Sequence, residues 1–96
     1  MPAYLVSIVE VKKPELYVEY AKAANEAATK HGGKFLLRGA PTEVFEGIFR
    51  GNRVVVSEWE NTDKARAYYN SPEYARAKAK RMGDVAEATI LLFEGV

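Results

Sequence analysis

Three side chains of this sequence could serve in acid–base catalysis. His31 is the only histidine, and Glu46 and Glu58 are carboxylates in or beside predicted strands. The two carboxylates could share a proton only if a sheet brought them together. Because side chains alternate along a strand, we expect Glu58 on the face that carries Val54 and Val56. His31, Glu46 and Glu58 are therefore candidate catalytic residues.

Structural interpretations compete with catalysis at two of the polar positions. His31 stands beside a glycine pair at a predicted helix C-terminus, where the helix dipole favours a cation. We favour a solvated or carbonyl-bonded cap over a catalytic base, because histidine commonly serves the last turn of a helix. Ser71 has no histidine or aspartate at a spacing typical of a nucleophilic triad, and a role as helix N-cap explains it fully.

A second group of side chains is suited to binding a small molecule. Its members are Arg38, Trp59, Tyr69, Tyr74 and Arg81. Arg38 could hold a carboxylate through two parallel hydrogen bonds, but we favour an ion pair with Glu46 or Glu58. The aromatic side chains could line a pocket and present their polar groups to a ligand. We slightly favour the alternative, in which they only pack in the core. Arg81 could close that pocket from two helical turns beyond Tyr74, or lie exposed on the helix.

The composition excludes several kinds of site. The chain has no cysteine, which excludes disulfides, thiolate zinc sites and cysteine nucleophiles. One histidine and scattered carboxylates give no convergent ligand set, so we expect no metal and no cofactor. The 14 Lys and Arg residues against 13 Asp and Glu leave a net charge of +1, which gives no field for attracting nucleic acid or an anionic membrane.

The length of 96 residues predicts one domain, 1–96. A chain of this size buries roughly 60 to 65% of its unfolded surface, so a partner chain would add useful burial. The strand-like run that follows Met1 has no basic segment or long apolar stretch before it. We therefore expect neither a signal peptide nor a membrane span, and a cytoplasmic protein.

Apolar patterning and turn residues predict the element order βαββαβ. Strands are expected over 4–11, 34–38, 53–60 and 88–94, with 43–46 as an extended continuation of the second strand. Helices are expected from 14 to about 31 and from 61 to 83, with an interruption at Asn70. This order predicts a ferredoxin-like α+β fold, an antiparallel sheet with its helices on one face.

Both faces of the outer strand runs are largely apolar. Tyr4, Val6 and Ile8 alternate with Leu5 and Val9. Since the helices can cover only one face, we expect two chains to press their other faces together around a twofold axis as a homodimer.

Five motifs, in the same order along the chain, carry a resemblance to a known family. They are His31–Gly39, Glu46–Gly47, Val55–Trp59, Ala67–Tyr74 and, with Arg81 before it, Glu94–Val96. Over essentially its whole length the chain resembles the domain of unknown function family 1330. It departs at Ala40, where a second glycine is common, and at Trp59, where phenylalanine is usual. The resemblance implies the dimeric α/β-barrel superfamily, in which two sheets form a barrel and a cleft lies between sheet and helices.

The resemblance alone does not choose a function. Some relatives in the superfamily are cofactor-free monooxygenases or isomerases, others bind haem or small acids, and this family has no agreed reaction. We expect a small homodimeric protein that binds a small anionic or aromatic metabolite in the cleft. The alternative is a cofactor-independent enzyme of the monooxygenase or isomerase type acting on a small organic substrate. RNA binding ranks last, because the third strand lacks the aromatic motif of the RNA-recognition fold.

Overall fold

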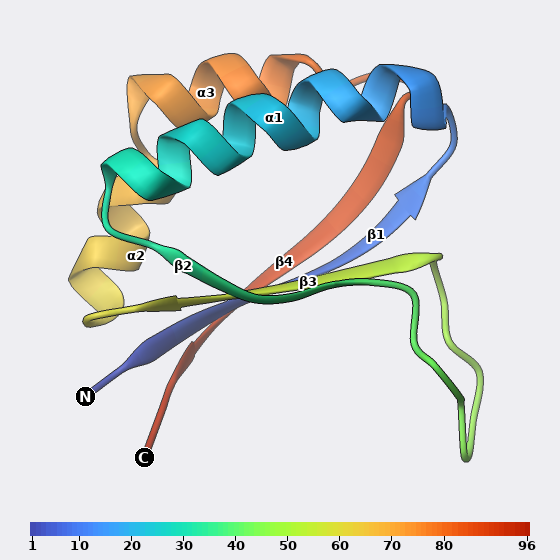
Figure 1. The fold of residues 1–96 in the computed structure, drawn as a ribbon, viewed down its shortest axis with the longest axis horizontal. Coiled ribbons are helices and arrows are strands. Elements are labelled where there is room, and N and C mark those ends of the chain that lie inside the picture. The colour runs from blue at the N-terminus through green and yellow to red at the C-terminus, as the bar shows by residue number, and fades with distance from the viewer.

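The computed structural model describes residues 1–96 and has one sheet and three helices (Figure 1). In chain order the elements are β1 (Ala3–Val11), α1 (Pro14–Lys30), β2 (Lys34–Gly39), β3 (Arg53–Trp59), α2 (Thr62–Tyr69), α3 (Pro72–Ala79) and β4 (Ala86–Glu94). The strands pair antiparallel in the order β2-β3-β1-β4. The predicted ferredoxin-like α+β fold is confirmed, with the second helical region divided into α2 and α3.

Local sequence signals set the helix boundaries. Pro14 opens α1, where its missing N–H costs no hydrogen bond, and Gly32 follows the helix with a φ of +86°. The Asn61 side chain accepts a hydrogen bond from the Lys64 backbone N–H at 2.9 Å, at the start of α2. Between α2 and α3, Ser71 Oγ accepts from the Tyr74 N–H at 3.1 Å. The predicted N-cap role of Ser71 is confirmed.

The segment between β2 and β3 differs from its prediction. Strand β2 ends at Gly39, and residues 40–52 contain no strand, so the extended continuation over 43–46 is wrong. Pro41 has no N–H for the ladder, and Gly47 adopts a φ of +84°, which turns the chain. The segment projects as an arm on the side of the sheet away from α1 and α3 (Figure 1), with Phe45 89% exposed at its surface.

One face of the sheet, which we call the covered face, packs against the helices. Its best-buried part lies where Ala3 of β1 pairs with Trp59 of β3, under alanines of α1. The Trp59 ring is 2% exposed and stacks on Tyr68 of α2 with 4.7 Å between ring centroids. This corner of the covered face is the tightest part of the core.

The opposite face of the sheet, which we call the open face, has no helix over it. Its central register places Val6 of β1 beside Val56 of β3 and Leu91 of β4, and Val56 pairs with Leu37 of β2 on its other side. Glu58 lies here, where the Tyr4 hydroxyl donates to Glu58 Oε2 at 3.3 Å. The strand alternation predicted for Glu58 is confirmed.

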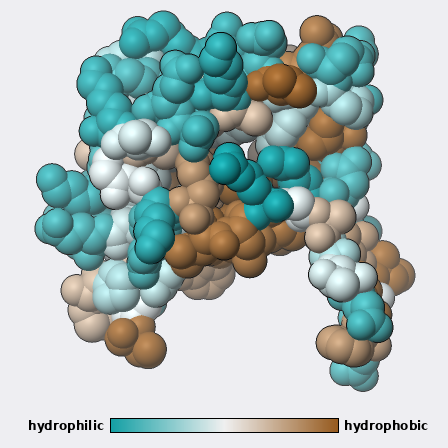
Figure 2. All heavy atoms as spheres, in the orientation of Figure 1, coloured by the Kyte–Doolittle hydropathy of each residue, from teal (hydrophilic) through white to brown (hydrophobic).

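The hydropathy of the surface follows this layering (Figure 2). Hydrophilic side chains dominate the helix layer, and apolar side chains show below it at the level of the sheet. A hollow opens between the two layers.

Candidate functional site

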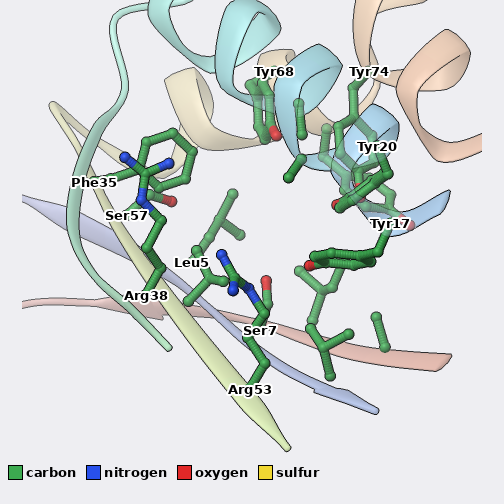
Figure 3. A pocket seen from close by; sticks show the side chains of 17 residues that line it. Leu5, Ser7, Tyr17, Tyr20, Phe35, Arg38, Arg53, Ser57, Tyr68 and Tyr74 are labelled. Atoms are coloured by element: carbon green, nitrogen blue, oxygen red, sulfur yellow. The ribbon is translucent and has the colours of Figure 1, made fainter. Parts of the chain in front are cut away.

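A cleft lies between the covered face and the helices (Figure 3). Its floor comes from the sheet and includes Ser7, Arg53 and Ser57, while its roof carries a row of tyrosines from the helices. These are Tyr17, Tyr20, Tyr68, Tyr69 and Tyr74. The cavity volume of the cleft is only about 50 Å³. The cleft is therefore a narrow slot rather than a chamber.

Two arginines reach into the cleft from neighbouring strands (Figure 3). The Arg38 guanidinium carbon lies 5.1 Å from the centroid of the Phe35 ring, and that of Arg53 lies 5.5 Å from the centroid of the Tyr17 ring. Neither arginine forms an ion pair with a carboxylate. Arg53 Nε is buried and has no hydrogen-bond partner. The cleft thus contains positive charge that the chain itself does not neutralise.

The hydroxyl groups around these arginines are hydrogen-bond partners rather than bases. Ser57 Oγ accepts from Trp59 Nε1 at 2.9 Å, which leaves the serine proton free to be donated. The hydroxyls of Tyr20 and Tyr74 share a hydrogen bond of 2.9 Å. Burial raises the pKa of Tyr20 and the pKa of Tyr68 well above that of a free phenol. Both phenols therefore stay protonated at neutral pH.

The three candidate catalytic residues lie outside the cleft and apart from one another. His31 Nε2 lies 2.9 Å from Glu73 Oε1 at the end of α1. His31 is the C-cap residue of α1, and its backbone N–H donates to the carbonyls of Ala27 and Ala28. Its side chain is neither freely solvated nor bonded to a helix carbonyl, because it bonds this charged acceptor instead. Hydrogen bonds from His31 and Lys30 lower the pKa of Glu73 to about 2. Glu46 is exposed on the arm, and Glu58 lies on the open face.

The five candidate ligand-binding residues separate into three places. Arg38, Tyr69 and Tyr74 line the cleft. The favoured ion pairs of Arg38 do not form, because Glu58 lies across the sheet and Glu46 is on the arm. Trp59 is core.

Arg81 is buried, so the alternative interpretation of Arg81 as an exposed helix residue is wrong. It follows α3, is 6% exposed, and donates from Nη2 to the Tyr74 hydroxyl at 3.4 Å. Its guanidinium carbon also lies 5.4 Å from the centroid of the Tyr20 ring. Arg81 thus contacts the roof of the cleft from behind.

Sequence reasoning missed several residues of the cleft. Ser7, Arg53 and Ser57 from the sheet and Tyr17 and Tyr20 from α1 were not singled out as ligand-binding candidates. A signal for the sheet residues was present. They occupy positions that alternate with the open face in otherwise apolar strands, and a polar side chain there needs a partner or a ligand.

Two general features of the structure bear on function. No three side chains among His, Cys, Asp and Glu are grouped so that they could hold a metal ion. None of the helices has both the length and the apolar character needed to cross a membrane.

The fold and the cleft define the chain as a ferredoxin-like α+β protein with a lined hollow between sheet and helices. The family described as Domain of unknown function (DUF1330) matches residues 2–96, and the chain belongs to this family. The resemblance drawn from the five motifs is thereby confirmed. No curated protein matches the sequence.

Solved structures share the fold at low sequence identity. A protein of unknown function from Rhodopseudomonas palustris is 16% identical, with 99% of this chain and 82% of that chain covered and a TM-score of 0.80. A dimeric ferredoxin-like protein of unknown function from Thermobifida fusca is 19% identical, with 97% and 90% covered and a TM-score of 0.68. SnoaB, a cofactor-independent oxygenase from Streptomyces nogalater, is 14% identical, with 99% and 93% covered and a TM-score of 0.73.

Proposed function

We propose that the protein binds a small, flat organic anion, an aromatic or conjugated carboxylate, in the cleft. The observation that carries this proposal is the pair Arg38 and Arg53, which face a wall of tyrosines and have no carboxylate partner. Arg38 is exposed, but the guanidinium group of Arg53 is partly removed from water and its Nε has no partner, which is costly unless an anion meets it. A bound carboxylate would supply that charge.

The chemistry of the lining selects the class of ligand. A guanidinium matches a carboxylate with two parallel hydrogen bonds, and the free Ser57 proton adds another donor on the floor. The narrow slot and its tyrosine roof favour a planar group that packs against rings. A ligand with a carboxylate joined to a conjugated or aromatic body meets both conditions.

Binding without turnover is supported by the side chains of the cleft, because none of those described above can act as a general base. A general base must lie within hydrogen-bond reach of its substrate. His31, Glu46 and Glu58 lie elsewhere, and the phenols of Tyr20 and Tyr68 hold their protons. The second candidate is a cofactor-independent enzyme of the monooxygenase or isomerase type, favoured by the fold shared with the oxygenase SnoaB. Oxygen uptake or isomerisation of a bound probe would distinguish this candidate from a binding protein.

We propose also that two chains pair through the open face. The apolar side chains there include Leu37, Leu91 and Phe93, which are 52%, 40% and 50% exposed in the single chain. A contiguous apolar patch of this kind is typical of an interaction surface. Structural relatives that are described as dimeric add support.

The binding proposal is tested with a matched pair of probes, cinnamate and the neutral amide cinnamamide. Amide resonances of the ¹⁵N-labelled protein are followed by NMR during titration with each probe. We expect cinnamate to bind saturably and at least tenfold more tightly than cinnamamide, because a charged hydrogen bond contributes about 1.5–3 kcal/mol. The shifts should centre on β3 and on the tyrosines of α1.

Two variants separate the cleft from a general charge effect. Arg53→Met should weaken cinnamate binding about tenfold or more, whereas Arg50→Met, at an exposed position of the arm, should leave it unchanged. The NMR spectrum of each free variant shows whether its fold is intact. Equal affinity for the two probes, or equal effects of the two variants, would remove the basis of the proposal.

A further inference from the structure

A second hollow, which we call the edge groove, lies on the helix side of the edge strand β4, against α2 and α3. Its walls include Ala65, Tyr69 and Met82. The volume of the edge groove is about 490 Å³, against about 50 Å³ for the cleft. Leu5, Tyr69, Ala88 and Ile90 line both, so the two hollows are neighbours with a shared wall.

The rim of the edge groove is cationic. Arg66, Lys78 and Arg81 contribute to its lining, and no carboxylate does. Arg66 is partly compensated by Asp63 at 3.2 Å, but Lys78 and Arg81 form no ion pair. Lys78 Nζ donates only to the Tyr69 hydroxyl, at 3.2 Å. Lys78 and Arg81 therefore both line the groove without a counter-charge.

Arg81 is the most informative of these side chains. It is 6% exposed, and its Nε is buried with no hydrogen-bond partner, although Nη2 donates to Tyr74. A buried guanidinium is costly when it is neither paired nor fully hydrogen-bonded. An anion in the groove, which Arg81 lines, would offset part of that cost by its charge.

The floor of the edge groove differs in chemistry from the cleft. The side chains below the cations are aliphatic, namely Leu5, Ala88, Ile90 and Leu92 with Met82 at the side, and Tyr69 is the one ring. The cleft, by contrast, has a roof of tyrosines. A flexible alkyl chain can follow an aliphatic floor, whereas a flat ring gains more between aromatic walls.

We propose that the edge groove is a second binding site, which takes an amphipathic anion with an aliphatic chain, of the fatty carboxylate class. The carboxylate meets Lys78 and Arg81, and the chain lies along the helix-facing side chains of β4. Charge complementarity at one end and apolar area along the floor select this class over a neutral lipid or an inorganic anion. The site is separate from the cleft and does not require the cleft to bind anything.

The test uses octanoate and its neutral counterpart octanamide, below the concentrations at which octanoate forms micelles. Titration of the ¹⁵N-labelled protein should give saturable shifts at Lys78 and Arg81 and along residues 88–92. Octanoate should bind about tenfold or more tightly than octanamide, because the charged contact is lost in the amide. Inorganic phosphate should not compete at equal concentration, since it has no chain for the floor.

A matched pair of lysine variants locates the site. Lys78→Met should weaken octanoate binding about tenfold, whereas Lys80→Met, two residues on and outside the groove, should leave it unchanged. Both positions are accessible enough to vary without opening the core, which avoids relying on the buried Arg81. Equal affinities for octanoate and octanamide, equal effects of the two variants, or shifts confined to the cleft would each overturn the proposal.

The two sites can fail independently. Arg53→Met should weaken cinnamate but not octanoate binding, and Lys78→Met should do the reverse. If octanoate binding is lost in Arg53→Met and retained in Lys78→Met, the ligand occupies the cleft and the edge groove is not a site.

Discussion

On the covered face of the sheet, Ser7, Arg53 and Ser57 interrupt the apolar side chains, whereas the centre of the open face is a continuous patch of Val6, Val56 and their neighbours. Both faces are built from the same strands, one residue apart. Most side chains of the covered face are apolar, as expected for a sheet packed against helices, but a few polar groups stand among them. The centre of the open face is apolar although no helix covers it.

The difference indicates two kinds of use for one sheet. A polar side chain below a helix layer costs free energy unless it finds a partner, so its presence there points to a ligand. An apolar side chain on a bare face costs free energy until another surface covers it. The covered face is thus suited to binding a small molecule, and the open face to binding a second chain.

The largest expected effect is that of a charge placed at the centre of the open face. Val56→Glu should convert the proposed dimer of 2 × 10.7 = 21.4 kDa into a monomer at micromolar concentration. A buried unpaired carboxylate costs several kcal/mol, which corresponds to about a thousandfold or more in the dimerisation constant. Sedimentation velocity over a range of concentrations measures the change.

The control for this prediction carries the same substitution on a different surface. Val18 on α1 is 61% exposed, away from the sheet, so Val18→Glu should leave the dimer intact. A wild-type protein that sediments as a monomer of 10.7 kDa at micromolar concentration would show that the open face does not pair two chains.

Much of the fold can be predicted from local signals in a single sequence. The proline at the start of α1, the serine cap at Ser71 and the apolar run of β3 act within a few residues, so they can be recognised without the structure. The arm was harder to predict. Residues 43–46 have strand-like composition, but Pro41 and the glycines around them leave the segment unpaired.

The candidate site was predicted less well, because it depends on contacts between distant elements. Arg38 belongs to the cleft, and its strand partner is Val55, two residues after Arg53 on the same face of β3. The sequence alone does not show this pairing, so Arg53 was missed. Arg81 was placed correctly beside Tyr74, yet its burial depends on how the turn after α3 packs. The seven-residue spacing from Tyr74 to Arg81 was informative although α3 ends at Ala79, whereas the convergence of side chains from β2, β3 and α1 was not visible in the sequence.

A smaller effect is expected at the closed corner of the covered face, which sharpens the contrast with the cleft beside it. A methyl group on Gly33 would overlap Cη2 of Trp59, so Gly33→Ala should lower the free energy of unfolding by about 1–3 kcal/mol. The contact is with the six-membered ring of the indole. The side chain of phenylalanine is shorter and does not reach as far toward Gly33. In a Trp59→Phe background the same substitution should cost less.

Urea unfolding of the wild type, the two single variants and the double variant measures this coupling. We expect an interaction of about 1–2 kcal/mol, within the range found for residues in contact. Strictly additive effects would mean that Gly33 is constrained by its backbone and not by contact with the indole.

The smallest expected effect concerns the interaction of Glu73 with Lys30 and His31, which we call the clasp because it joins α1 and α3. Glu73 of α3 accepts hydrogen bonds from Lys30 and His31 at the end of α1, at 3.0 and 2.9 Å, and these lower its pKa from 4.5 to about 2. The folded state therefore binds this proton less tightly than the unfolded state does. The stabilisation is complete above about pH 4.5 and is lost as the pH falls toward 2.

Replacing Glu73 should remove this part of the pH dependence. The melting temperature of Glu73→Gln should lie a few degrees below that of the wild type at pH 6. The difference should become small near pH 2, where about half of the folded wild type has a protonated Glu73, and should vanish at lower pH. Asp63→Asn, which breaks the exposed pair with Arg66, is the control for losing a carboxylate elsewhere. Because the clasp joins the two helices that carry Tyr20 and Tyr74, Glu73→Gln should also weaken cinnamate binding slightly at pH 6. A melting difference that stays constant from pH 6 to 2 would show that the clasp acts by packing and not by charge.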